Sequence, residues 1–128
     1  MSFFKVDMGR EAEDKSGILY VLVFILDDGT EVCKIGVTKR DVQVRVCEIL
    51  SSFWNKYRYF PYCRPKKFSS MDDVYAKEAM MHKYFEEYRY KTEHKFSGST
   101  EFFKGVELDE VVRVYKLVKD GVDVLQSK

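Results

Sequence analysis

The feature that most constrains the fold is the stretch from Ile18 to Leu26, in which nine consecutive residues are apolar or aromatic. A run of this length without polar alternation predicts a central strand that is covered on both faces. Asp27-Asp28-Gly29 follows and predicts a three-residue hairpin loop with the glycine in the left-handed conformation. The second strand of the hairpin is then expected over about Glu31 to Val37.

The length of this loop decides which side chains of the hairpin share a face. With three loop residues, Tyr20 lies opposite Gly36 and Lys34 lies opposite Leu22, so Tyr20 and Lys34 point to the same side. A two-residue turn would place them on opposite sides. An ammonium beside a phenol favours the phenolate, which makes Tyr20 a candidate general base. Taken singly, each residue also fits an ordinary explanation, a packed strand tyrosine and a solvent-facing lysine.

Three helices are expected from caps and from apolar residues at helical spacing. The first covers about Asp41 to Phe53 and carries Arg45 at the edge of its apolar stripe. Arg45 is either a solvated surface residue or a fork of donors for a phosphate. The last helix covers about Leu108 to Lys119, and Gly121 stops it.

The second helix, over about Ser70 to Tyr88, holds the strongest independent signal. Its apolar stripe includes Glu78 and His82, one helical turn apart. A carboxylate rarely points inward without a cationic partner or a metal ion, so Glu78 is a candidate ligand or the partner of a nearby cation. A lone histidine on an apolar face is more commonly a packing residue than a ligand, and we expect this of His82.

A basic and aromatic segment lies between the first two helices. It contains no acidic residue from Asn55 to Ser70, and Pro61 and Pro65 favour an edge strand over about Tyr57 to Lys67. Cations and aromatic rings together suit phosphate neutralisation and base stacking, whereas lysine and arginine also keep ordinary edge strands soluble. The candidate DNA-binding residues are Lys56, Arg58, Arg64, Lys66 and Lys67.

The order of Tyr20, Lys34-Ile35-Gly36, Arg45 and Glu78 resembles the GIY-YIG nuclease superfamily, in particular small phage and bacterial members with Lys-Ile-Gly in place of Tyr-Ile-Gly. The resemblance implies an α+β fold, with a three-stranded, mainly antiparallel sheet flanked by helices. The asparagine that follows the glutamate in many members is absent here. A catalytically weak DNA-binding module of the same fold, or a phage protein-interaction factor, are therefore the alternatives to an active enzyme.

The activity implied by the resemblance is metal-dependent cleavage of DNA by an endonuclease. Tyr20, with Lys34, would deprotonate the attacking water, and Glu78 would hold one Mg²⁺ or Mn²⁺ ion. Arg45 would stabilise the charge that develops on the phosphate. Gly36 and His82 would lie next to these catalytic groups and support their positions.

Length and composition suggest one domain with short flanking segments. We expect a polar N-terminal arm over residues 1–16, a GIY-YIG-like nuclease domain over 17–120 and a tail over 121–128. The longest apolar run is too short to span a bilayer, and three cysteines without paired spacing suggest reduced thiols. These features point to the cytoplasm of a bacterium or of a phage-infected host. Recognition of a particular DNA sequence would have to come from this domain itself, from a homodimer or from a partner.

Overall fold

The computed structural model describes residues 14–127. The arm expected over residues 1–16, including Phe3 and Phe4, therefore lies outside the described residues except at its end. The elements, in chain order, are β1 (Gly17–Ile25), β2 (Glu31–Thr38), α2 (Val42–Tyr57), β3 (Tyr62–Met71), α3 (Val74–Tyr84), a 3₁₀ turn (Glu86–Tyr88), β4 (Phe102–Lys104), α4 (Leu108–Lys119) and a second 3₁₀ turn (Val124–Ser127). No helix among these residues is long and apolar enough to cross a membrane.

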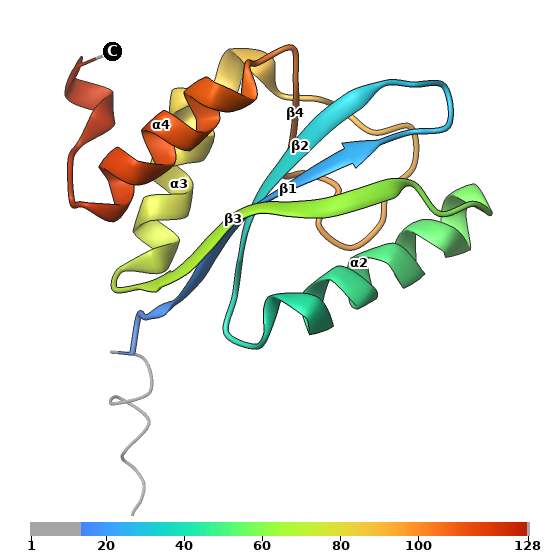
Figure 1. Ribbon diagram of the computed structural model, residues 1–128, viewed down its shortest axis with the longest axis horizontal. Coiled ribbons are helices and arrows are strands. Elements are labelled where there is room, and N and C mark those ends of the chain that lie inside the picture. Colours follow the sequence, from blue (N-terminus) through green and yellow to red (C-terminus); the bar gives the residue numbers. More distant parts are fainter. Residues whose placement is uncertain (1–13, 128) are drawn as a thin grey trace, which may run out of the picture.

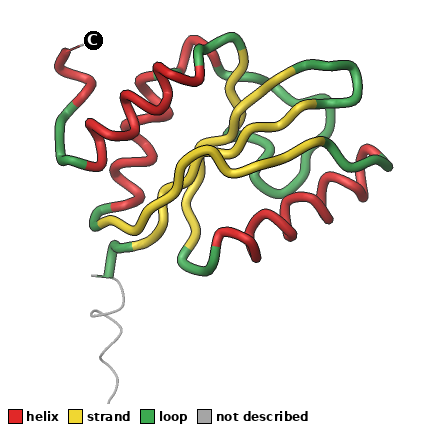
Figure 2. The backbone as a smooth tube through the Cα atoms, viewed as in Figure 1, coloured by secondary structure: helices red, strands yellow, loops and turns green. Residues whose placement is uncertain are grey.

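The four strands form one antiparallel sheet in the order β3-β1-β2-β4. Helix α2 covers one face of this sheet, and α3 and α4 cover the other (Figures 1 and 2). The expected α+β class is confirmed, but the sheet has four strands rather than three. The extra strand, β4, contains only three residues, which is too few to show an alternating pattern in the sequence.

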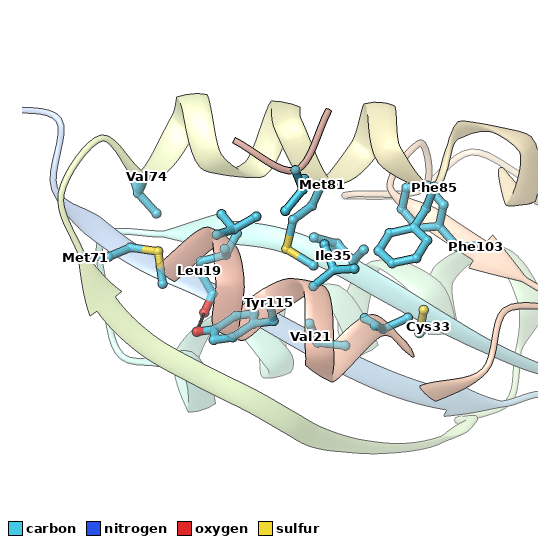
Figure 3. Close-up of a cluster of buried hydrophobic side chains, with 14 residues drawn as sticks. Leu19, Val21, Cys33, Ile35, Met71, Val74, Met81, Phe85, Phe103 and Tyr115 are labelled. Atoms are coloured by element: carbon cyan, nitrogen blue, oxygen red, sulfur yellow. Dashed lines mark hydrogen bonds between the residues drawn. The ribbon is translucent and has the colours of Figure 1, made fainter. Parts of the chain in front are cut away.

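Strand β1 is central, as its unbroken apolar run predicts. Leu19 and Val21 belong to the core beneath α3 and α4, whereas Tyr20, Leu22 and Phe24 belong to the core beneath α2. Figure 3 shows the first of these cores, in which the hydroxyl of Tyr115 from α4 donates a hydrogen bond to the carbonyl of Leu19 over 2.7 Å. Both faces of β1 are therefore fully covered.

The hairpin between β1 and β2 has the predicted register. Gly29 has a φ of +87°, and the Leu26 amide donates to the Thr30 carbonyl over 2.9 Å, which closes the loop. Tyr20 accordingly pairs with Gly36, and Lys34 pairs with Leu22. The two polar side chains share the face of the sheet that α2 covers.

The helix boundaries differ from the prediction at three places, one of which is the end of α3 at Tyr84 rather than near Tyr88, where the separate 3₁₀ turn Glu86–Tyr88 follows. Helix α2 extends to Tyr57 rather than ending near Phe53. Helix α3 begins at Val74 rather than near Ser70, because residues 69–71 continue β3 and pair with the first residues of β1. Apolar residues at helical spacing do not reveal that the residues of the expected first turn pair with another strand instead. Helix α4 has the predicted bounds, Leu108–Lys119.

Strand β3 is an edge strand, as expected, but it covers residues 62–71. Its register against β1 shifts between Val21 and Leu22, next to Pro65, which pairs with Leu22. A proline cannot donate to the ladder, so a bulge at an outer strand is a favourable place for it.

Candidate active site

The centre of the site is the buried ammonium of Lys34 on β2. Its side chain is fully buried, its Nζ donates a hydrogen bond to the Tyr20 hydroxyl over 2.9 Å, and it forms an ion pair with Glu101 Oε1 over 2.5 Å. A buried charge is strongly unfavourable unless it is paired and hydrogen-bonded. Lys34 therefore depends on both partners, one from β1 and one from the residue that precedes β4.

Two glycines leave the space that this arrangement occupies. A Cβ atom on Gly36 would lie 2.5 Å from the Tyr20 hydroxyl oxygen and 2.8 Å from Lys34 Nζ. Gly98 has a φ of +80°, and a Cβ atom there would lie 2.5 Å from Lys34 Cε. The segment around Gly98 thus closes over the lysine, and any side chain at either glycine would displace it.

Arg45 reaches the same place from the first turns of α2. This helix begins at Val42, and the Asp41 side chain caps it by accepting a hydrogen bond from the Gln43 amide over 2.7 Å. Arg45 Nη1 donates to the Ser97 hydroxyl over 3.0 Å and to Glu48 over 3.2 Å.

Burial lowers the pKa of the Arg45 guanidinium, but hydrogen bonds with Tyr20 and Glu48 outweigh burial and raise it above its ordinary value. The Tyr20 hydroxyl therefore lies between two cations, the Lys34 ammonium and the Arg45 guanidinium.

Helix α3 supplies Glu78 and His82 from the other side of the sheet. His82 Nε2 lies 2.7 Å from the carbonyl oxygen of Ile35 and 3.9 Å from Glu78 Oε2. A carbonyl oxygen only accepts hydrogen bonds, so this nitrogen must carry the proton and donate it. Burial lowers the pKa of His82, which favours the neutral ring. His82 thus joins α3 to β2, and its Nε2 is not available as a metal ligand.

The carboxylates of Glu78 and Glu101 lie near each other beside the buried Lys34 ammonium. Burial raises the pKa of Glu78 to about 7, and the charge of the neighbouring Glu101 adds to this effect, whereas Lys34 opposes it. The sequence analysis assigned no role to Glu101. The signal that could have found it is an acidic residue placed directly before two aromatic residues that enter the core, Phe102 and Phe103.

The predicted residues Tyr20, Lys34, Arg45 and Glu78 therefore lie around one place, and Glu101 joins them. We call these five residues the Lys34 cluster. The cluster lies at the N-terminal end of β4, because Phe102, the first residue of this strand, pairs with Lys34. Tyr20 and Lys34 are fully buried, whereas the side chains of the other three are partly exposed. The cluster is a charged rim over a buried phenol–ammonium pair.

The predicted DNA-binding cations do not gather around this cluster. Lys56 and Arg58 lie at the C-terminal end of α2. Arg64 and Lys67 pair with Val23 and Val21 of β1, so their side chains start from the face opposite to Tyr20. Lys66 lies at the register shift of β3. The five cations are therefore divided between the end of α2 and β3, away from the Lys34 cluster.

The fold and the Lys34 cluster define a small α+β domain with a charged, partly buried site at the edge of an antiparallel sheet. The model of the family described as the T5orf172 domain matches residues 17–119, so the chain belongs to the T5orf172 domain family. This family is nuclease-like, which supports a nucleic-acid-related role. No curated protein and no solved structure matches the chain significantly.

The family match corrects the resemblance to the GIY-YIG superfamily. The T5orf172 domain is a distinct family, and no GIY-YIG model matches the chain. The resemblance rested on a few residues in short motifs, and such residues can meet at a sheet edge in more than one family. The domain that we expected to be GIY-YIG-like is therefore a T5orf172 domain.

We expect Glu78→Gln to stabilise the folded protein at high pH. Because the folded state raises the pKa of Glu78 from 4.5 to about 7, protonated Glu78 contributes stability that is complete below 4.5 and is lost as the pH rises through 7. Glutamine resembles the protonated form. The free energy of unfolding of the variant should exceed that of the wild type by up to about 3 kcal/mol near pH 8, and match it near pH 4.

Urea unfolding at both pH values, without divalent cations, measures this difference. Glu31→Gln serves as the control, because Glu31 is an exposed glutamate at the start of β2. Equal stabilities of the Glu78→Gln variant and the wild type near pH 8 would contradict the burial of this carboxylate.

Proposed function

We propose that this protein is a nuclease that hydrolyses phosphodiester bonds of DNA at the Lys34 cluster. The observation that carries the proposal is the fully buried Lys34 ammonium, which is held between a phenol and a carboxylate with a guanidinium alongside. Such an arrangement is not needed for packing, since apolar residues of similar size would be as stable or more stable. Perturbed charged groups at a partly exposed rim are typical of catalytic sites.

The roles of the residues follow from their surroundings. Tyr20 would act as the general base and take a proton from water as the water oxygen bonds to phosphorus. Arg45 would turn its donors from Ser97 and Glu48 to the phosphate oxygens, where charge accumulates as the bond to the leaving oxygen breaks. Because Tyr20 is fully buried, this step requires the segment around Gly98 to move away from Lys34 when DNA binds.

The carboxylates of Glu78 and Glu101 suit a divalent cation, which we propose to be Mg²⁺ or Mn²⁺. Their mutual repulsion adds to the raised pKa of Glu78, and a cation between them would relieve it. Magnesium is commonly held by one or two carboxylates and water. Within residues 14–127 no group of three or more acidic, histidine or cysteine side chains forms a ligand cage, so these two carboxylates would be the protein ligands. When bound, the ion supplies neutralisation of the phosphate charge.

Plasmid nicking in the presence of Mg²⁺ tests the proposed activity. We expect the wild type to convert supercoiled plasmid to the open-circle form. The Arg45→Met variant should do so about 100-fold more slowly, because it loses the donors for the developing charge. Glu78→Gln should lose activity to a similar degree, and Glu31→Gln should keep it. A wild-type protein that is folded but nicks no plasmid with Mg²⁺ or Mn²⁺ would refute the proposal.

One observation favours a second candidate function, DNA binding without cleavage. Tyr20 and Lys34 are buried, and Arg45 is already hydrogen-bonded to two side chains. In this case the exposed cations would bind DNA, and the affinity would fall steeply with salt. Glu78→Gln would then leave the affinity unchanged, whereas no variant would cleave.

A further inference from the structure

A pair of stacked aromatic side chains is exposed at the C-terminal end of α2. The rings of Trp54 and Phe60 lie 5.0 Å apart at an interplanar angle of 19°. Their exposed fractions are 37% for Trp54 and 62% for Phe60. Large apolar rings that remain this exposed next to each other commonly mark a binding surface.

This pair is not needed to hold the end of the helix in place. The neighbouring Phe53 is buried and stacks on Tyr57, with ring centroids 4.1 Å apart. Tyr59 and Phe96 pack edge-on against Phe53. The helix end is therefore anchored by a separate aromatic cluster, and Trp54 and Phe60 lie outside it.

The surroundings of the pair are positively charged. No acidic residue occurs from Ile49 to Met71, whereas five lysines and arginines do. Within the described part of the chain, none of these five cations forms a salt bridge, although exposed cations of other segments do. Two of them, Lys56 and Arg58, lie between Trp54 and Phe60 in the sequence. Unpaired cations beside exposed rings complement a phosphate backbone that carries bases.

We propose that Trp54 and Phe60, with Lys56 and Arg58, form a binding site for single-stranded nucleic acid. An exposed ring can stack on a base only when the base is not already stacked in a duplex, so the site selects unpaired bases. The cations hold the adjacent phosphates. This site goes beyond the proposed cleavage reaction, because Trp54 follows Arg45 by nine residues on α2 and therefore projects from the opposite side of the helix.

The single tryptophan of the chain provides a direct measurement, since its fluorescence reports only on this site. We expect a 20-nucleotide oligo-dT to quench Trp54 fluorescence saturably, with an affinity that falls as salt rises. A duplex of equal length should bind at least about tenfold more weakly by this signal. Phe60→Ala should weaken binding of oligo-dT about tenfold, in line with the loss of one stacked base. All titrations contain EDTA, which separates binding from metal-dependent cleavage.

The control variant is Tyr75→Ala, which removes an aromatic ring of α3 that is 51% exposed but lies outside this surface. It should bind oligo-dT like the wild type, and circular dichroism should show that both variants are folded. The proposal is overturned if oligo-dT leaves Trp54 fluorescence unchanged, if the duplex quenches it equally well, or if Phe60→Ala binds as tightly as Tyr75→Ala. Each of these results leaves the plasmid nicking assay as a separate test of cleavage.

Discussion

Lys34→Met should abolish DNA cleavage and lower the free energy of unfolding by roughly 3 kcal/mol. Methionine matches the length of the aliphatic part of lysine, so the cavity changes little. The Tyr20 hydroxyl and the Glu101 carboxylate both lose the donor that they contact over 2.9 and 2.5 Å. Tyr20 is fully buried and cannot turn to water, and its hydroxyl loses one of the two cations beside it.

Chemical unfolding and plasmid nicking measure the two effects of Lys34→Met. Lys39→Met is a matched control, because Lys39 is an exposed lysine directly after β2 that donates to the Asp14 carbonyl over 2.9 Å and lies 4.0 Å from the Asp14 carboxylate. A surface pair of this kind contributes about 0–1 kcal/mol, so the control should be nearly as stable as the wild type. If both variants were equally stable and equally active, the buried ion pair would have no part in either property.

Gly36→Ala should reduce cleavage about 100-fold while it lowers the free energy of unfolding by about 2 kcal/mol. The new methyl group would lie 2.5 Å from the Tyr20 hydroxyl oxygen and 2.8 Å from Lys34 Nζ. The flexible lysine can shift, but the tyrosine ring is fixed in the core beneath α2. The substitution therefore moves the two groups apart and leaves the rest of the fold intact.

Thermal melting and nicking kinetics of the Gly36→Ala variant test this expectation. The loss of activity is then compared with the loss of stability. A loss of activity that exceeds the loss of stability indicates displaced catalytic groups. Wild-type activity together with an unchanged melting temperature would show that the Tyr20 ring does not lie against Gly36.

The sequence determined the hairpin and its register because local chemistry decides both. Three loop residues with a glycine in the left-handed conformation place Tyr20 opposite Gly36, and the structure has this pairing. The bounds of α4 were also predictable, because its apolar spacing is regular and Gly121 has a positive φ after its end. The start of α3 was not predictable, since residues 69–71 pair with a strand that is about fifty positions earlier in the chain.

One of the five residues of the Lys34 cluster, Glu101, and the glycine that closes over Lys34 escaped the sequence for a related reason. Glu101 and Gly98 belong to an irregular segment, where no period relates a residue to a face. Their positions become clear only when β4 pairs with β2 and brings the preceding residues onto Lys34. The family assignment was wrong because short motifs specify a few contacts, whereas a family is defined over the whole domain.

The early end of β4 has a consequence for the behaviour of the protein in concentrated solution. Among residues 14–127, no strand pairs with the outer edge of β2 beyond Lys34, and such edges promote pairing between molecules. Here the Ile35 amide donates to the Glu101 carbonyl over 3.1 Å, and the Ile35 carbonyl accepts from His82. The groups that surround Lys34 therefore also protect an open strand edge from self-association. In the proposed nuclease, substrate entry and resistance to aggregation would consequently depend on the same few hydrogen bonds.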